Sequence, residues 1–294
     1  MDHVVYEFCH GVFGAMLRDD QPLKEAHLLP PLWEEAANSF AGTLFYDVTL
    51  YRISRSRWRY NITCVTDLGD VLVIKELSQL LKDSRIQHVR FAEIGEDLGK
   101  AITSKDLKEK LVPLILSQLC DQSQLEIEKK TDWNVVQRFA SLTRTKHLRL
   151  HYYDQEAGLI LAQKIEQGLL KSVYLGSTWP EHFNFELVAL ANCRHLSCLY
   201  ISCSNLYLAP AVFRSFLQRW KQANGQLYIS VCGAGKFQPE DIEYCYQGLK
   251  TFKCKRGLTF KIGNHRLRLE YRIHSVVMYT YCKRSCKCYR DAQI

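Results

Sequence analysis

Short segments with two apolar residues on either side of a polar or aromatic one recur along the chain. They read HVRF, QLEI, HLRL, SVYL, CLYI and QLYI, with their second apolar residues at Phe91, Ile127, Leu150, Leu175, Ile201 and Ile229. This alternation is typical of β-strands with one buried face. The intervals between these residues are 36, 23, 25, 26 and 28 positions. The last five strands therefore recur at a spacing within or close to that of leucine-rich repeats.

Amphipathic segments between these strands predict helices. WNVVQRFASL, LILAQKIEQGLL, FELVALA and AVFRSFLQRWKQA place apolar residues three to four positions apart, which suits a helix that packs one face on a layer of strands. Pro210 at the start of the last segment and Gly225 after its end agree with the residue preferences of helix termini. Because one strand and one helix cannot bury their apolar faces alone, such units have to stack on one another.

The pattern predicts an α/β fold: an irregular leucine-rich-repeat-like solenoid over residues 70–250. The alternative is a doubly wound α/β domain, whose strands are usually buried on both faces and form unbroken apolar runs. The residues inside the apolar pairs are instead polar or aromatic, for example Arg90, Arg149 and Tyr200. This favours a sheet with one face free of helices.

The two ends of the chain differ from the repeats. Residues 1–42 predict a helical N-terminal cap, and residues 43–69 predict a β-hairpin with a basic turn at 54–57. Residues 251–294 predict a basic, β-rich C-terminal cap and tail. An open solenoid needs caps of this kind to cover its first and last units.

The organisation resembles a nematode-expanded family of F-box-like and leucine-rich-repeat-like proteins. Members open with Met-Asp-x-Val-Pro-x-x-Phe-Cys, followed by a tryptophan with small and acidic residues and by an aromatic hairpin. The matching residues are Met1, Asp2, Val4, Phe8 and Cys9, then Trp33 to Ala37, then Trp58, Arg59 and Tyr60. Val5 departs from the family's proline, and the chain lacks a clear Leu-Pro opening of an F-box.

The resemblance implies a degenerate F-box within residues 4–40. An F-box docks on the small adaptor of cullin-type ubiquitin ligases, while the repeats behind it choose the substrate. The resemblance therefore implies a ubiquitin-ligase adaptor as a partner and a role as a substrate receptor.

Composition narrows the class of protein further. The 294 residues are 47% hydrophobic, which is ample for a core, and no apolar run approaches the roughly 18 to 20 residues that cross a bilayer. The 12 cysteines are scattered singly, which favours a reduced intracellular protein, cytoplasmic or nuclear, over a disulfide-bonded secreted one. Residues 250–294 contain 12 of the 39 basic residues but two of the 31 acidic ones, so the net charge of +8 belongs to the C-terminal segment.

Side chains that alternate away from the apolar pairs are candidate partner-binding residues, since they share the opposite face of the predicted sheet. We expect Tyr174, Tyr200 and Tyr228 to stack in register across three strands. Tyrosine and arginine are enriched at binding hot spots, although tyrosine is also simply a good strand residue. The full candidate set is Arg90, Glu126, Arg149, His151, Tyr174, Tyr200 and Tyr228.

The basic C-terminal segment is a candidate anion-binding surface for nucleic acid or anionic lipid. Its aromatic residues suit base stacking in single strands. A soluble cap with a charged edge is the alternative. The candidate residues are Lys253, Lys255, Arg256, Arg266, Arg268, Lys283 and Arg284.

Catalytic and metal-binding patterns are weak. Cys282, Cys286 and Cys288 lack a second pair at zinc-site spacing. The segment CGAGKF fails the phosphate-loop pattern because Phe237 replaces the magnesium-binding hydroxyl. We therefore expect no metal, no cofactor and no enzyme activity, but a protein-recognition module that binds a partner on the strand face, with nucleic-acid or anionic-lipid binding as the alternative.

Overall fold

The structure is a computed structural model that divides the chain into two compact units, Met1–Leu148 and Arg149–Ile294. The residues that it describes are 31, 33–34, 45–65, 71–74, 85–93, 99–202, 205–235, 237, 241–242, 246–254, 257–263, 265–271 and 275–280. The boundary between the units falls inside the range 70–250 that was predicted as one repeat region.

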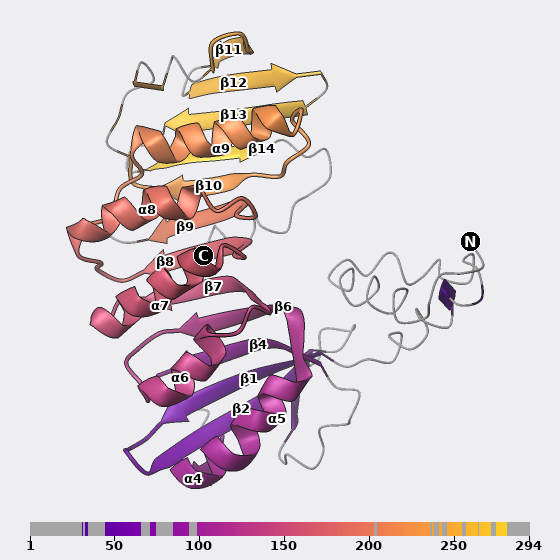
Figure 1. The fold of residues 1–294 in the computed structure, drawn as a ribbon, viewed down its shortest axis with the longest axis vertical. Helices are drawn as coiled ribbons and strands as arrows, with labels where there is room; N and C mark the ends of the chain where they lie inside the picture. The colour runs from indigo at the N-terminus through magenta and orange to yellow at the C-terminus, as the bar shows by residue number, and fades with distance from the viewer. Residues whose placement is uncertain are drawn as a thin grey trace. The chain divides into compact units, whose positions relative to one another are not determined.

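The first unit is built on a mixed sheet (Figure 1). Its strands are β1 (Phe45–Arg52), β2 (Arg57–Val65), β3 (Val71–Ile74), β4 (Arg85–Ala92), β5 (Lys100–Thr103) and β6 (Leu119–Ile127). Their order is β3-β2-β1-β4-β6, and β5 pairs with β2. β1 pairs antiparallel with β2 and parallel with β4, which pairs parallel with β6.

One row of register partners explains why these segments form a sheet with a single apolar face. Ile62, Val48, Val89 and Leu125 follow one another across β2, β1, β4 and β6, and each is at most 1% exposed. Their sequence neighbours point the other way because side chains alternate along a strand.

Helices of the first unit follow β5 and β6. α4 (Ser104–Asp106), a π-helical turn (Leu107–Leu111) and α5 (Val112–Gln118) are consecutive, and α6 (Trp133–Ala140) lies between β6 and β7 (Thr145–His151), the strand that contains the unit boundary. The Asp132 side chain accepts a hydrogen bond from the Asn134 amide and caps α6. The Trp58 indole donates to Ser104 Oγ at 3.1 Å, which ties the β1–β2 hairpin to the start of α4.

The second unit also has a mixed sheet. Its strands are β8 (Ser172–Gly176), β9 (Cys198–Ser202), β10 (Ser230–Gly233), β11 (Lys250–Cys254), β12 (Gly257–Ile262), β13 (His265–Tyr271) and β14 (Val276–Thr280). Their order is β11-β12-β13-β14-β10-β9-β8. The pairs among β8, β9 and β10 are parallel, and those from β10 through β14 to β11 are antiparallel.

Three helices cover one face of the second sheet: α7 (Gln155–Gln167), α8 (Asn184–Ala191), which follows a short turn at Glu181–Phe183, and α9 (Pro210–Gln222) (Figure 1). Gly168 ends α7 with a left-handed φ of 64°, a conformation that glycine adopts without strain. Pro210 occupies the first turn of α9, and Gly225 follows it at φ 80°, as the sequence predicts.

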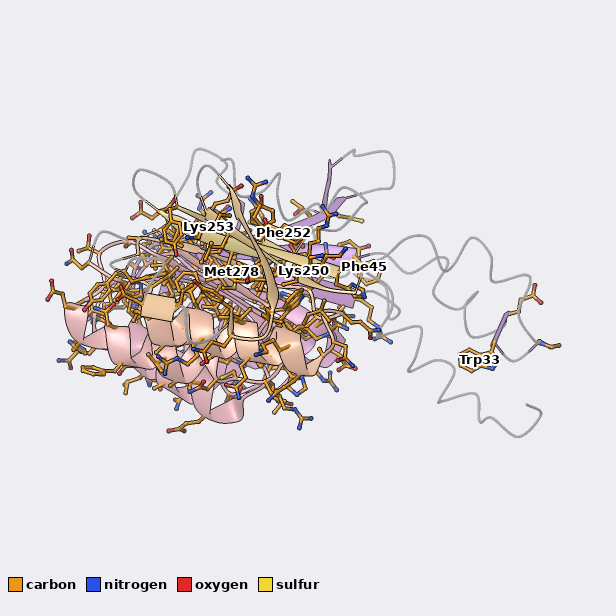
Figure 2. All side chains as sticks on the ribbon, turned by 90° about the horizontal axis from the view of Figure 1, so that it is seen from above. Trp33, Phe45, Lys250, Phe252, Lys253 and Met278 are labelled. Carbon is orange, nitrogen blue, oxygen red and sulfur yellow. The ribbon has the colours of Figure 1, made fainter. Side chains whose placement is uncertain are left out.

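The core of the second unit lies between these helices and the sheet. Register partners Val173, Leu199, Val231, Met278, Leu269 and Leu258 cross six strands, and none is more than 4% exposed. Met278 is labelled in Figure 2. Trp179 and Trp220 fill the space on the helical side and are fully buried.

The prediction of a leucine-rich-repeat-like solenoid with a helical N-terminal cap is wrong, because both units are mostly mixed sheet. In a solenoid each unit contacts only its neighbours along the chain. Here β1 pairs with β4 although β2 and β3 intervene, and β10 pairs with β14 although β11 to β13 intervene. The antiparallel end segments are continuous with the parallel strands by backbone hydrogen bonds, so neither is a separate cap.

Some local predictions are confirmed. The hairpin within residues 43–69 is β1 and β2, and the antiparallel strands after residue 250 are β11 to β13. The predicted N-terminal helices at 1–42, which include the segment 4–40 compared with an F-box, lie outside the described residues except for positions 31, 33 and 34.

Two observations bear on the class of protein. None of the helices in the described part of the chain is both long enough and apolar enough to span a bilayer. Five described cysteines are free thiols: Cys64, Cys120, Cys193, Cys198 and Cys232.

Candidate functional site

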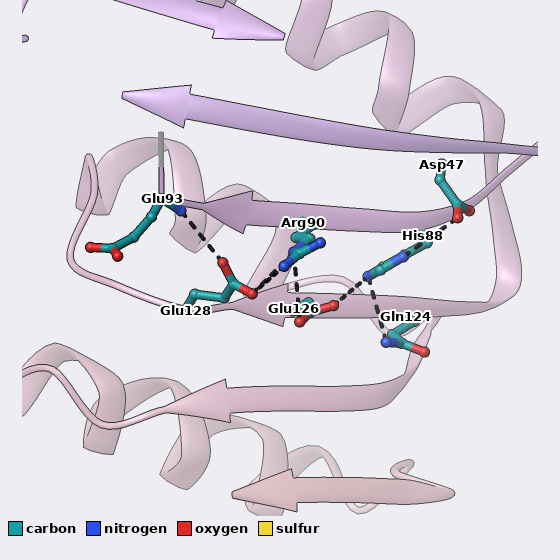
Figure 3. A network of polar contacts seen from close by, with 7 residues as sticks. All are labelled: Asp47, His88, Arg90, Glu93, Gln124, Glu126 and Glu128. Carbon is teal, nitrogen blue, oxygen red and sulfur yellow. Dashed lines mark hydrogen bonds and ion pairs between the residues drawn. The ribbon is translucent and has the colours of Figure 1, made fainter. Parts of the chain in front are cut away.

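The polar face of the first sheet carries a network of charged side chains (Figure 3). Asp47 on β1 is the register partner of His88 on β4, and His88 is the partner of Gln124 on β6. Two residues further along, Arg90 is the partner of Glu126. The period of two along each strand therefore brings these groups together on the face opposite the apolar row.

His88 lies between two carboxylates. Its Nε2 is 3.0 Å from Glu126 Oε2, and its Nδ1 is 3.7 Å from Asp47 Oδ2. Burial lowers the pKa of His88, but hydrogen bonds and charge interactions with Asp47 and Glu126 outweigh burial and raise the pKa to about 9. His88 is therefore a cation at neutral pH.

Arg90 bridges the two strands on the other side of Glu126. Its guanidinium binds Glu128 through Nη2 and Nε, and Nε lies 3.7 Å from Glu126 Oε1. The Glu93 amide donates to the second oxygen of Glu128 at 3.4 Å. Glu126 itself is buried, at 4% exposure, with a cation near each carboxylate oxygen.

Of the two partner-binding residues predicted in the first unit, only Arg90 is accessible. Its side chain is 43% exposed. Glu126 is too buried to be a main contact for a partner, and a buried carboxylate of this kind is held in place by its paired cations. Asp47 and His88 were missed by the sequence reasoning, because their proximity depends on the pairing of β1 with β4.

The polar face of the second sheet brings together four of the predicted partner-binding residues. Tyr174 on β8 and Tyr200 on β9 are direct register partners, and both are partly exposed. The Arg149 guanidinium carbon lies 4.5 Å from the centroid of the Tyr174 ring, a cation–π geometry. The His151 ring centroid is 5.9 Å from that of Tyr174.

Hydrogen bonds hold the polar ends of this cluster. The Tyr200 hydroxyl lies 2.7 Å from Ser230 Oγ on β10, and His151 Nδ1 lies 3.1 Å from Ser177 Oγ. The His151 ring also packs over Gly176, where a Cβ atom would come within 2.8 Å of Cε1. The absence of a side chain at Gly176 thus makes room for the imidazole.

The expected register of Tyr228 is wrong. β10 begins at Ser230, and the register partner of Tyr200 is Cys232. Tyr228 lies four residues earlier and is partly exposed. The segment QLYI has the same pattern as the other strands and predicts Leu227 and Ile229 as the core pair. The apolar residues that face the core here are instead Ile229 and Val231, each 0% exposed.

The predicted anion-binding residues divide into three groups. Lys253 on β11 and Arg266 on β13 are exposed. Arg268 lies with its Nε 2.7 Å from Glu270 Oε1, so its charge is compensated. The remaining residues lie outside the described part of the chain: Lys255, Arg256, Lys283 and Arg284.

Metal binding has no support in the described part of the chain, where no three His, Cys, Asp or Glu residues are grouped to hold an ion. Cys282, Cys286 and Cys288 lie outside it. Comparison of the chain with protein-family models, curated proteins and solved structures finds no match. These comparisons therefore give no support to the F-box and leucine-rich-repeat assignments.

Proposed function

We propose that the protein is a non-enzymatic recognition protein that binds a protein partner through the polar face of β8 and β9. The observation that carries the proposal is the direct pairing of Tyr174 with Tyr200, with the Arg149 guanidinium 4.5 Å from the Tyr174 ring centroid. We call the set Arg149, His151, Tyr174 and Tyr200 the aromatic face.

Preorganisation supports this proposal. Tyrosine and arginine dominate binding hot spots because each combines a large contact area with a polar end. Ordering a mobile side chain on binding costs about 0.5–1.5 kcal/mol. Here the Tyr200 hydroxyl is already held by Ser230, and Tyr174 is already packed against Arg149 and His151. These side chains have already lost much of their rotamer freedom on folding, so binding a partner would cost less conformational entropy.

The setting that fits this proposal is intracellular, because five described cysteines are free thiols and three of them, Cys64, Cys193 and Cys198, are buried. Thiols in such positions behave as small hydrophobic side chains.

The test is affinity purification of the full-length chain and of the double variant Tyr174→Ser, Tyr200→Ser, followed by quantitative mass spectrometry. A protein enriched by the wild type should fall at least tenfold with the double variant. That protein, once purified, should bind the wild type directly and bind the double variant at least tenfold more weakly.

The matched control is Phe185→Ser. Phe185 lies on α8, on the helical side of the sheet. The residue is 81% exposed and is not part of the core. This variant should retain the partner. A partner that binds the double variant and the wild type equally, with both proteins folded by circular dichroism, would refute the role of the aromatic face.

A further inference from the structure

A row of three cations crosses β11, β12 and β13. Lys250 is the register partner of Lys261, and Lys261 is the register partner of Arg266. Lys250 and Arg266 are exposed and Lys261 is partly exposed. Neighbouring strands lie about 4.8 Å apart, so the row places three positive charges within about 10 Å. We call these three residues the cation row.

The cation row is electrostatically unfavourable in the protein by itself. Like charges directly opposite each other on neighbouring strands destabilise a sheet. Within the described residues, no carboxylate forms an ion pair with Lys250, Lys261 or Arg266. The adjacent Arg268 shows the contrast, because its charge is compensated by Glu270. Among the described residues, the cation row is therefore an uncompensated positive site that could hold an anionic ligand.

An exposed aromatic ring lies beside the cation row. Phe252 follows Lys250 by two positions, so both side chains are on the same face of β11. Phe252 is 46% exposed, and Lys250 Nζ is 5.5 Å from its ring centroid. Figure 2 labels Lys250, Phe252 and Lys253 on this strand.

Protection of a sheet edge explains only part of this arrangement. β11 ends the strand order of its unit, and lysine on an edge strand discourages pairing with other chains. Lys250 and Lys253 would be enough for that purpose. Lys261 and Arg266 lie on inner strands, where they do not protect the edge. An exposed phenylalanine on the edge strand would favour pairing with other chains, which is the opposite of what the edge lysines do.

We propose that the cation row and Phe252 bind single-stranded nucleic acid. The three cations would contact backbone phosphates, and the Phe252 ring would stack on a base. Proteins that bind single strands combine a basic track with aromatic rings in this way, because every base has a flat face that can stack. The residues are separate from the aromatic face, so this proposal does not depend on the proposed function.

The test is fluorescence anisotropy with the full-length protein and a labelled 12-nucleotide single-stranded RNA of mixed sequence, between 50 and 300 mM salt. The triple variant Lys250→Gln, Lys261→Gln, Arg266→Gln should bind at least tenfold more weakly at the lowest salt. The slope of log K against log salt should become shallower by about 2, since each phosphate contact in a single strand contributes about 0.7.

The Phe252→Ser variant separates stacking from charge. It should weaken binding at least fivefold and leave the salt slope unchanged, because the ring carries no charge. The matched control is Lys105→Gln, Lys110→Gln, Arg214→Gln, which removes three exposed cations from α4, the π-helical turn and α9. This control should bind as the wild type does.

Three results would overturn the proposal. The first is wild-type binding weaker than 100 μM at 50 mM salt, and the second is equal binding by the wild type and the folded triple variant. The third is binding to vesicles that contain phosphatidylserine, lost in the triple variant, without binding to the RNA. That third result would assign the cation row to a membrane surface instead.

Discussion

His88 Nε2 lies 3.0 Å from Glu126 Oε2, and this contact joins β4 to β6 across the polar face of the first sheet. Arg90, also on β4, lies 3.7 Å from the other oxygen of the same carboxylate. Because Glu126 is almost completely buried, these interactions are largely shielded from water. We therefore assign Glu126 to the stability of the sheet.

The stability of the first unit should depend on the protonation of His88. Its pKa is raised from 6.5 to about 9 in the folded protein, so folding favours the protonated ring. The stabilisation is fully present below about pH 6.5 and is lost as the pH rises through 9. We expect a loss on the order of 3 kcal/mol between pH 6 and pH 10, measured by urea unfolding.

The variant His88→Gln separates this effect from other titrations. It should be less stable than the wild type at pH 6, and the difference should shrink by pH 10. A constant difference at both pH values would contradict the raised pKa. Direct titration of the ring by NMR in the wild type should show a midpoint near 9.

Removing the buried carboxylate should be more damaging than removing an exposed one. Glu126→Ala leaves His88 and Arg90 near each other without the group between them, and loss of one partner of a buried ion pair costs about 3–5 kcal/mol. The pKa of His88 should fall toward its ordinary value in the same variant. Glu93→Ala is the control, since the Glu93 side chain is 77% exposed, and it should change stability by less than about 0.5 kcal/mol.

Ile201 should not tolerate a charge. It is 6% exposed on β9, and its Cβ lies 3.0 Å from the place that a Cβ would occupy at Gly233 on β10. Ile201→Asp puts an unpaired carboxylate into the core and should cost about 4 kcal/mol or more, seen as loss of cooperative thermal unfolding. Leu159→Asp, at a position 59% exposed on α7, should unfold within a few degrees of the wild type.

Gly257 should resist substitution because the neighbouring strand leaves no room for a side chain. A Cβ atom there would collide with the Leu269 carbonyl oxygen, which belongs to the backbone of β13 and cannot rotate away. Gly257→Ala should therefore displace β12 from β13 and lower stability by about 2–3 kcal/mol. Thr259→Ala on the same strand should cost at most about 1 kcal/mol. Equal effects of the two substitutions in urea unfolding would argue against the close contact.

Secondary structure was largely predictable from local pattern. Five of the six short apolar segments lie in strands β4, β6, β7, β8 and β9, and the four amphipathic segments overlap α6 to α9. The prediction of a strand at the sixth segment, QLYI, was wrong in register. Tyr228 and Ile229 precede β10, and the register partner of Leu199 is Val231. A period of two marks which residues face the core, but it does not mark where pairing with the next strand begins.

The candidate sites were predictable only in part. Tyr174 and Tyr200 could be placed together because they occupy the same position in two successive strands of the same kind. The contact of Asp47 with His88 and the row from Lys250 to Arg266 could not, since both depend on which strands become neighbours. A regular spacing of strands suggested a solenoid, yet spacing alone does not decide strand order.

The amino-acid sequence by itself determined which face of most strands and helices is apolar, because that property depends on residues two to four positions apart. The tertiary structure alone decided that β1 lies beside β4 and β14 beside β10. Backbone hydrogen bonds are nearly the same for every residue, so strand order is set by which long-range pairings bury the most apolar surface together. That order, in turn, places the charged network and the cation row on the polar faces of their sheets.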